Sequence, residues 1–157
     1  MISAITNPGT VRFMTYHGTL TVKVLLRFFR RLIKDAKRKV FLILDNLRVH
    51  HAHLVREWLT QHKDEIKVYY LPSYSPKINP DKYLNGDLED RIRSATPARN
   101  MKQFQHTVVG HMRKLQSQPE RIKNHFQHHN IAYAAWMYLN ARLTSYFTYH
   151  NATSKYH

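Results

Sequence analysis

A run of five apolar residues, Val40 to Leu44, constrains the fold of this chain more than any other stretch. The run is rich in β-branched and aromatic side chains, and it ends abruptly at Asp45 and Asn46. Such a run is typical of a strand that is buried in a sheet. Sheets of α/β proteins bind ligands and metals beyond the carboxyl ends of their strands, so Asp45 is the first candidate for chemistry.

The residues after Asp45 predict a crossover to a second strand. Apolar residues recur at helical spacing between Leu54 and His62, and Ile66 to Leu71 alternates as a strand near a sheet edge does. A helix between two strands is what a parallel connection requires. The prolines between Pro72 and Pro80 then force an extended loop, and Asn79 followed by Pro80 favours the start of another helix.

The flanking segments predict an α/β sheet with a helical C-terminal region. Strand-like runs on both sides of Asn7-Pro8-Gly9 indicate a β-hairpin, and an amphipathic helix with a solvated basic face follows up to about Lys34. Helices alone are indicated from Asp81 to about residue 128, which fits a helical flank. Residues 136–157 are aromatic and poorly periodic. A docked strand or helix, a disordered end and read-through sequence all fit this tail.

The charge of the chain favours a polyanionic partner. The 157 residues include 25 Lys and Arg against 10 Asp and Glu, a formal charge of +15, which points to nucleic acid rather than to a membrane surface. No apolar run reaches the roughly 20 residues that span a bilayer. The absence of cysteine excludes disulfides and fits a reducing cytoplasm. Twelve histidines are present, but none has the local context of a zinc site.

Four segments in a fixed order carry a resemblance to a known family. They are Leu42-Ile43-Leu44-Asp45-Asn46, His50-His51, Tyr70-Leu71-Pro72-Ser73-Tyr74-Ser75-Pro76 and Asn79-Pro80. Their order and spacing resemble the catalytic core of DDE transposases of the mariner-like superfamily, in its bacterial insertion-sequence branch. The resemblance covers roughly residues 1–135. It implies a ribonuclease-H-like sheet and cleavage and strand transfer of DNA at transposon ends and target, with Mg²⁺ or Mn²⁺ as the cofactor.

In that family three acids hold two metal ions. Asp45 matches the second acid, which follows the central strand. The first acid lies on a strand that precedes the position of Met1, so the resemblance implies an N-terminally truncated domain whose first strand is missing. The third acid falls at Lys82, and a charged lysine cannot bind Mg²⁺. Asp81 is the only local substitute, although a shift of one residue in a helix turns a side chain by about 100°. We therefore predict Asp45 and Asp81 as the catalytic and metal-binding residues.

Other residues are predicted to lie near this site or to face DNA: Asn46, His50, His51, Ser73, Tyr74, Lys77 and Lys82. Asp87, Glu89 and Asp90, further along the helix, are expected to be solvated. The chain is thus predicted to be a transposase fragment with a partial endonuclease domain at 1–135 and an atypical tail at 136–157, impaired in DNA cleavage. The alternatives are a non-catalytic remnant that associates with DNA, with itself or with a full-length transposase, and a chain without a stable fold whose hairpin edge is unpaired.

Overall fold

The fold is a mixed α/β sheet with helices on both faces. The computed structural model describes residues 1–72, 78–127, 131 and 145–150. The elements are β1 (Ile2–Ile5), β2 (Val11–Met14), α1 (Val22–Ala36), β3 (Val40–Leu44), the one-turn 3₁₀ helix η1 (Arg48–His51), α2 (His53–Gln61), β4 (Ile66–Tyr70), α3 (Asp81–Ser94), α4 (Met101–Gln116), α5 (Pro119–His125) and β5 (Ser145–His150). The predicted α/β class with a run of helices after the second crossover strand is confirmed.

The five strands form one sheet in the order β2, β1, β5, β3, β4. Strand β1 pairs antiparallel with β2 and β5, whereas β3 pairs parallel with β4 and β5. Helix α2 makes the crossover between the parallel strands β3 and β4, as predicted, and β4 lies at the sheet edge. The sheet is therefore antiparallel on one side of β5 and parallel on the other.

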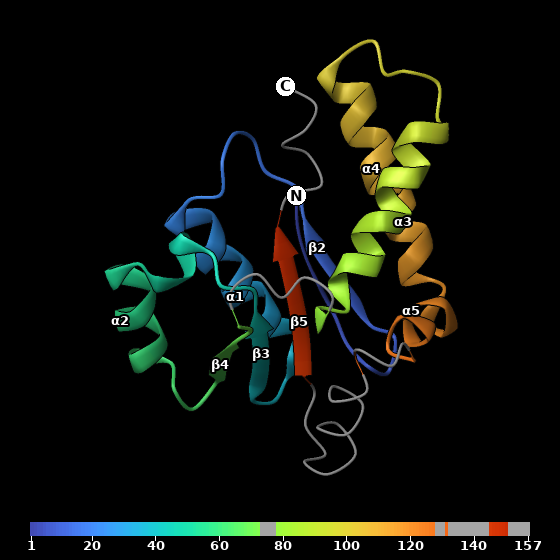
Figure 1. Ribbon diagram of the computed structural model, residues 1–157. Helices are drawn as coiled ribbons and strands as arrows, with labels where there is room; N and C mark the ends of the chain where they lie inside the picture. Colours follow the sequence, from blue (N-terminus) through green and yellow to red (C-terminus); the bar gives the residue numbers. More distant parts are fainter. Residues whose placement is uncertain (73–77, 128–130, 132–144, 151–157) are drawn as a thin grey trace.

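Alternation along the strands divides the core into two layers. Even positions of β1 and β3, among them Ile2, Ala4 and Leu42, pack against α1 and α2. Odd positions, among them Ile5 and Ile43, pack against α3, α4 and α5. This is the period of two that a strand imposes on its side chains. In Figure 1 the helices α1 and α2 lie on one side of the sheet and α3 to α5 lie on the other.

The predicted turn and helix start are formed, together with a cap at α1. Gly9 has a φ of +92°, and a Cβ there would lie 2.4 Å from the Pro119 carbonyl oxygen, so the hairpin turn requires glycine. The Thr21 hydroxyl accepts a hydrogen bond from the Val24 N–H at the start of α1. At the start of α3 the Asn79 side chain accepts one from the Asp81 N–H. The two hydrogen bonds join residues three and two positions apart, so they depend on local sequence, whereas the close approach at Gly9 involves Pro119 far along the chain.

Strand β5 is a central element that the sequence pattern did not assign. It lies within the tail at 136–157, yet its main chain pairs with both β1 and β3 at the centre of the sheet. The expectation that the hairpin edge is unpaired is therefore wrong, because β5 occupies that edge of β1. Of the three interpretations left open for the tail, a docked strand describes residues 145–150. No helix among the described residues is long and apolar enough to cross a bilayer.

Candidate active site

Asp45 is the first residue after β3, and its carboxyl group is mostly removed from water. Its side chain is 18% exposed, and its Oδ1 atom is buried without a hydrogen-bond partner among the described residues. Burial disfavours the charged form and raises the Asp45 pKa to about 7, although a hydrogen bond at the Asp45 main chain acts in the opposite direction. Asp45 therefore carries a carboxyl group that is about half ionised near neutral pH.

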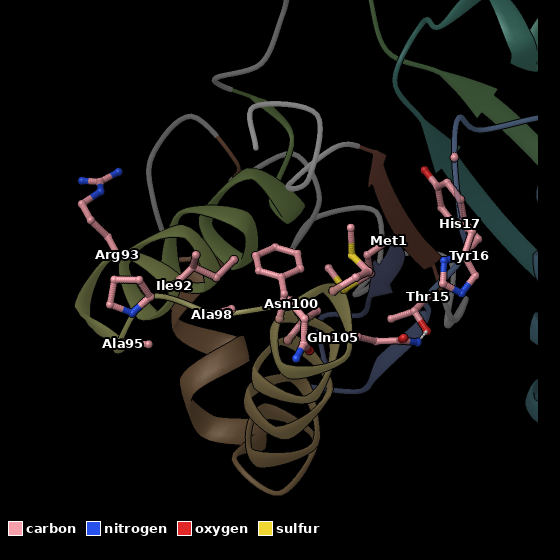
Figure 2. Close-up of a pocket in the computed structure, with 15 residues that line it drawn as sticks. Met1, Thr15, Tyr16, His17, Ile92, Arg93, Ala95, Ala98, Asn100 and Gln105 are labelled. Atoms are coloured by element: carbon pink, nitrogen blue, oxygen red, sulfur yellow. Dashed lines mark hydrogen bonds between the residues drawn. The ribbon is translucent and has the colours of Figure 1, made fainter. Parts of the chain in front are cut away.

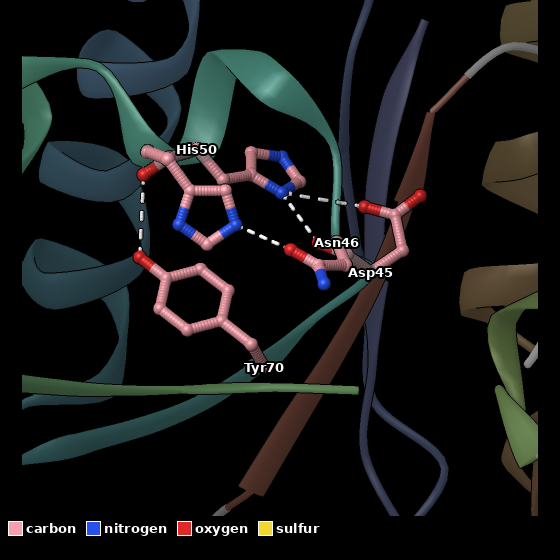
Figure 3. Close-up of polar contacts among 5 residues, drawn as sticks. Asp45, Asn46, His50 and Tyr70 are labelled. Carbon is pink, nitrogen blue, oxygen red and sulfur yellow. Dashed lines mark hydrogen bonds and ion pairs between the residues drawn. The ribbon is translucent and has the colours of Figure 1, made fainter. Parts of the chain in front are cut away.

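His50 is a buried neighbour of Asp45 that supports the strand end. Its Nδ1–H donates to the Asp45 carbonyl oxygen at 2.6 Å, and the same nitrogen lies 3.4 Å from Asp45 Oδ1 (Figure 3). Burial is the main cause that lowers the His50 pKa, to about 4. Between pH 4 and pH 7 both groups are thus mainly neutral, and their contact is not an ion pair. His50 acts here as a hydrogen-bond donor that fixes the main chain of Asp45.

A second pair of contacts holds the segment that follows Asp45. The His51 Nε2–H donates to the Asn46 Oδ1 atom, and the Tyr70 hydroxyl donates to the His50 carbonyl oxygen at 3.2 Å (Figure 3). The rings of His51 and Tyr70 are 4.5 Å apart. The predicted neighbours Asn46, His50 and His51 therefore do gather around Asp45. Their contacts tie η1 to the ends of β3 and β4.

The raised Asp45 pKa gives a test by stability. The folded protein binds the Asp45 proton more tightly than the unfolded chain does, so the contribution of Asp45 to stability falls as pH rises from about 4 to about 7. Asn is neutral and of similar shape. We expect the stability of Asp45→Asn relative to the wild type to grow by about 2–3 kcal/mol between pH 5 and pH 8. Urea unfolding at both pH values measures this change.

The wild type and Asp45→Asn share all other titrating groups. The contributions of those groups therefore cancel in the stability difference between the two proteins. Asp64→Asn, the same substitution at an exposed carboxylate, serves as the matched control. A stability difference between Asp45→Asn and the wild type that is the same at pH 5 and pH 8 would show that Asp45 has an ordinary pKa in the folded protein.

Asp81 is fully buried at the start of α3. The Ser3 hydroxyl lies 3.0 Å and 3.2 Å from its two carboxylate oxygens, and Asn85 Nδ2 donates to Oδ2 at 3.1 Å. The Ser3 contact links α3 to β1, and the Asn85 contact lies within α3. Lys82, one residue later, is exposed to solvent. The one-residue offset thus turns Asp81, and not Lys82, toward the sheet.

Strand register relates Asp45 to Ser3. Ser3 pairs with Tyr149 in the ladder of β1 and β5, and Leu44 pairs with Thr148 in the ladder of β3 and β5. Continuing the second register by one residue puts Asp45 level with Tyr149 and hence with Ser3. Neighbouring strands lie about 4.8 Å apart, so roughly 10 Å separates the main chains of Asp45 and Ser3. Strand β5 lies between them.

The carboxyl groups of Asp45 and Asp81 belong to the same face of the sheet. Met1 and Ile5, the odd positions on either side of Ser3, belong to the core beneath α3 to α5, as does Ile43 two residues before Asp45. Because side chains alternate along a strand, Ser3 and Asp45 share that face, and Asp81 reaches it through Ser3. The fold therefore places Asp45 and Asp81 on one face, on either side of β5.

This arrangement fits one ligand of a metal site but not a complete two-ion centre. The Oδ1 atom of Asp45 is buried beside His50 Nδ1 and has no hydrogen-bond partner among the described residues, whereas the oxygens of Asp81 already accept hydrogen bonds from Ser3 and Asn85. The described residues contain no group of three or more His, Asp and Glu side chains able to hold a metal. Ser73, Tyr74 and Lys77 lie outside the described residues.

A further polar cluster, which the sequence did not indicate, joins α3, α4 and α5. Arg121 Nη2 donates to Asp87 Oδ1 at 2.5 Å, and His111 Nε2 lies 3.8 Å from the same oxygen. The Asp87 side chain is 14% exposed, so the prediction that it is solvated is wrong. Burial is the first cause that lowers the His111 pKa, which leaves this contact without a full ion pair at neutral pH. The cluster connects three helices that are adjacent in sequence.

An apolar cavity of about 520 Å³ lies away from Asp45, between the end of β2 and the helices α3 and α4. Figure 2 shows Met1 and Gln105 at this cavity, with a hydrogen bond from Gln105 to the Thr15 hydroxyl. Its lining includes Ile92 and Phe104 and contains no Asp or Glu. The cavity cannot supply the carboxylates that metal-dependent chemistry needs.

A comparison with known protein families gave a match. A family model described as DDE superfamily endonuclease matches residues 1–105, which include Asp45, Asp81 and the strands β1 to β4. The searches of curated proteins and of solved structures gave no significant match. The family match covers about two thirds of the 157 residues, and on this basis the chain belongs to the DDE superfamily endonucleases.

Proposed function

We propose that this chain is the endonuclease domain of a transposase, of the mariner-like insertion-sequence type, and that its DNA cleavage is impaired. The family match supports a transposase-type nuclease. The observation that supports the proposal is the strand register, which puts Asp45, the residue after β3, level with Ser3, the hydrogen-bond partner of Asp81. The net charge of +15 suits DNA as the partner.

We further propose that the sheet is ribonuclease-H-like and that β5 takes the position of the family's first strand. A strand joined to β1 by a hairpin would pair with the edge of β1 that β2 leaves open. Strand β5 pairs with that edge and runs antiparallel to β1. Its sequence, Ser145-Tyr146-Phe147-Thr148-Tyr149-His150, contains no acid. The position of the first acid is thus filled by a strand that lacks one.

Asp45, His50 and Asp81 would supply part of what metal-dependent DNA cleavage requires. Mg²⁺ or Mn²⁺, when bound, would activate the attacking water or hydroxyl and stabilise the leaving oxygen. Asp45 would offer a carboxylate oxygen to the cation, and His50 holds the Asp45 main chain in place. Asp81 would contribute only by exchanging its hydrogen bonds with Ser3 and Asn85. This incomplete donor set is the physical reason for the proposed impairment.

A nicking assay tests this proposal. With supercoiled plasmid and Mn²⁺ or Mg²⁺, we expect the purified wild type to nick DNA at a low rate, and Asp45→Ala to abolish that activity. We expect Lys82→Glu to leave the rate unchanged within about twofold. Lys82 is exposed while Asp81 faces the sheet, so a carboxylate at position 82 would point to solvent.

Three outcomes would redirect the proposal. A large gain of activity in Lys82→Glu would mean that position 82 is the third ligand and that the helix start can rotate. Wild-type nicking that persists in Asp45→Ala would place the activity outside this site. DNA binding without any metal-dependent nicking would support the alternative of a DNA-associating or transposase-docking remnant.

A further inference from the structure

Helix α1 carries a row of cations on the side that faces away from the sheet. The α1 basic stripe consists of Lys23, Arg27, Arg30, Arg31 and Lys34, all of them exposed. At 100° per residue these five side chains fall within an arc of about 100°. Their stems together line a shallow groove of about 330 Å³. The buried residues of α1 lie on the opposite arc and pack on the core beneath the sheet.

The charges of the stripe are not neutralised within the described part of the chain. Asp35 is the one acid in α1, and it pairs with Arg12 of β2 at 3.0 Å. No ion pair of the described residues involves a member of the stripe. Arg30 instead lies 5.8 Å from the centre of the Trp58 ring of α2. Core packing explains the apolar arc of α1, but it does not require five cations on the outer arc.

The stripe has the dimensions of a contact with a nucleic-acid backbone. From Lys23 to Lys34 it extends about 16 Å along the helix axis. Each strand of duplex DNA presents one phosphate charge per roughly 3.4 Å of helix axis, so this length matches about five phosphates of one strand. Lys23, Arg27 and Arg31 are spaced by four residues and form a straight ridge along the helix. The groove between the stems could receive one strand of phosphates.

The position of the stripe separates it from the candidate active site. Asp81 lies on the face of the sheet covered by α3 to α5, whereas α1 covers the other face (Figure 1). Bending a short duplex around the domain costs on the order of several kcal/mol. DNA held on the stripe is therefore a different segment from the DNA presented to Asp45 and Asp81.

We propose that the α1 basic stripe is a second DNA-binding surface, which holds the phosphate backbone of a duplex segment that does not enter the active site. The inference rests on the proposed function, because that function supplies DNA as the partner. A reaction that joins two DNA segments needs more than one surface for them. The stripe binds by charge, so it reads no base sequence.

Salt dependence of DNA binding tests the stripe. Binding of a 30-base-pair duplex of arbitrary sequence is measured with chelator present and at several salt concentrations. Each phosphate contact contributes about 0.9 to the slope of log K against log salt. We expect the triple variant Lys23→Gln, Arg27→Gln, Arg31→Gln to reduce the magnitude of that slope by about two to three.

A second triple variant with the same loss of charge distinguishes the effect of the α1 basic stripe on DNA binding from the effect of net charge. Arg99→Gln, Lys102→Gln, Arg113→Gln removes the same three charges from exposed positions next to and on α4, and we expect a change in slope below one. The charge-preserving variant Arg27→Lys, Arg31→Lys should keep the wild-type slope. Circular dichroism and thermal unfolding confirm that each variant folds. If the triple Gln variant does not fold, the double variant Arg27→Gln, Arg31→Gln replaces it.

Each other result overturns the proposal in a distinguishable way. Equal losses in the two triple variants would mean that only net charge matters. An unchanged slope in the stripe variant, with the wild type binding DNA, would refute the stripe while leaving DNA as a partner. A wild type that binds no DNA would refute the stripe and the DNA partner together. Stripe-dependent binding to vesicles of anionic phospholipid, without a DNA effect, would assign the surface to membranes.

Discussion

Removal of residues 136–157 is expected to abolish cooperative unfolding of the domain. The deletion takes away β5, which pairs with β1 and β3 at the centre of the sheet. Each backbone hydrogen bond is worth about 1 kcal/mol net, so the loss of two ladders approaches the 5–15 kcal/mol stability of a typical domain. It also leaves two unpaired strand edges inside the sheet, which favours aggregation. Urea unfolding and size-exclusion chromatography of the deletion variant measure these effects.

A shorter deletion is the control for this experiment. Removing only residues 151–157 keeps β5, and we expect a cooperative transition with a midpoint close to that of the full chain. Phe147→Pro provides an independent test, because Phe147 pairs with both Ile5 and Ile43 and proline cannot donate to a ladder. A cooperative transition at the wild-type midpoint in the longer deletion would show that β5 does not support the sheet.

The second large effect is expected from placing a carboxylate on β5. Tyr149 is the residue that the strand register puts level with Ser3 and, by continuation, with Asp45. If the proposed function is correct, Tyr149→Asp supplies the acid that β5 lacks. Oxygen ligands from several elements are what Mg²⁺ and Mn²⁺ require. We expect at least a tenfold tighter binding of Mn²⁺ by calorimetry and at least a tenfold faster nicking of plasmid DNA.

The neutral variant Tyr149→Asn isolates the role of the charge. It has the shape of the Asp variant, and we expect it to keep the wild-type affinity for Mn²⁺. Combining Tyr149→Asp with Asp45→Ala should remove both gains, because the added acid needs Asp45 as its partner. Identical Mn²⁺ binding by the Asp and Asn variants would mean that the register position does not place the two carboxylates around one site.

Most strands and helices of the described residues up to 127 follow from local patterns. The run Val40 to Leu44 forms β3 at the predicted bounds, and Asn7-Pro8-Gly9 forms the predicted turn. The pattern also put an acid at the end of a central strand, where Asp45 lies. These features depend on alternation, helical spacing and turn chemistry, all of which act between residues close in the chain.

The surroundings of the candidate site could be found only in three dimensions. Sequence spacing left Asp81 as a doubtful substitute next to Lys82, and the contacts of Asp81 with Ser3, 78 residues away, show which of the two side chains turns inward. The pKa of Asp45 rises because folding buries its carboxyl group, which no local pattern reports. Asp87 likewise looked solvated until α5 brought Arg121 to it.

The sequence by itself determined the family, the crossover from β3 to β4, the basic charge and the two candidate acids, because each of these is written in short patterns or in composition. Only the tertiary structure decided that β5 completes the sheet and that Asp45 and Asp81 lie on either side of it. The physical reason is that strand pairing joins main-chain groups about 140 residues apart through hydrogen bonds that carry little side-chain signature, so the pairing is fixed by what edges the folded sheet leaves open.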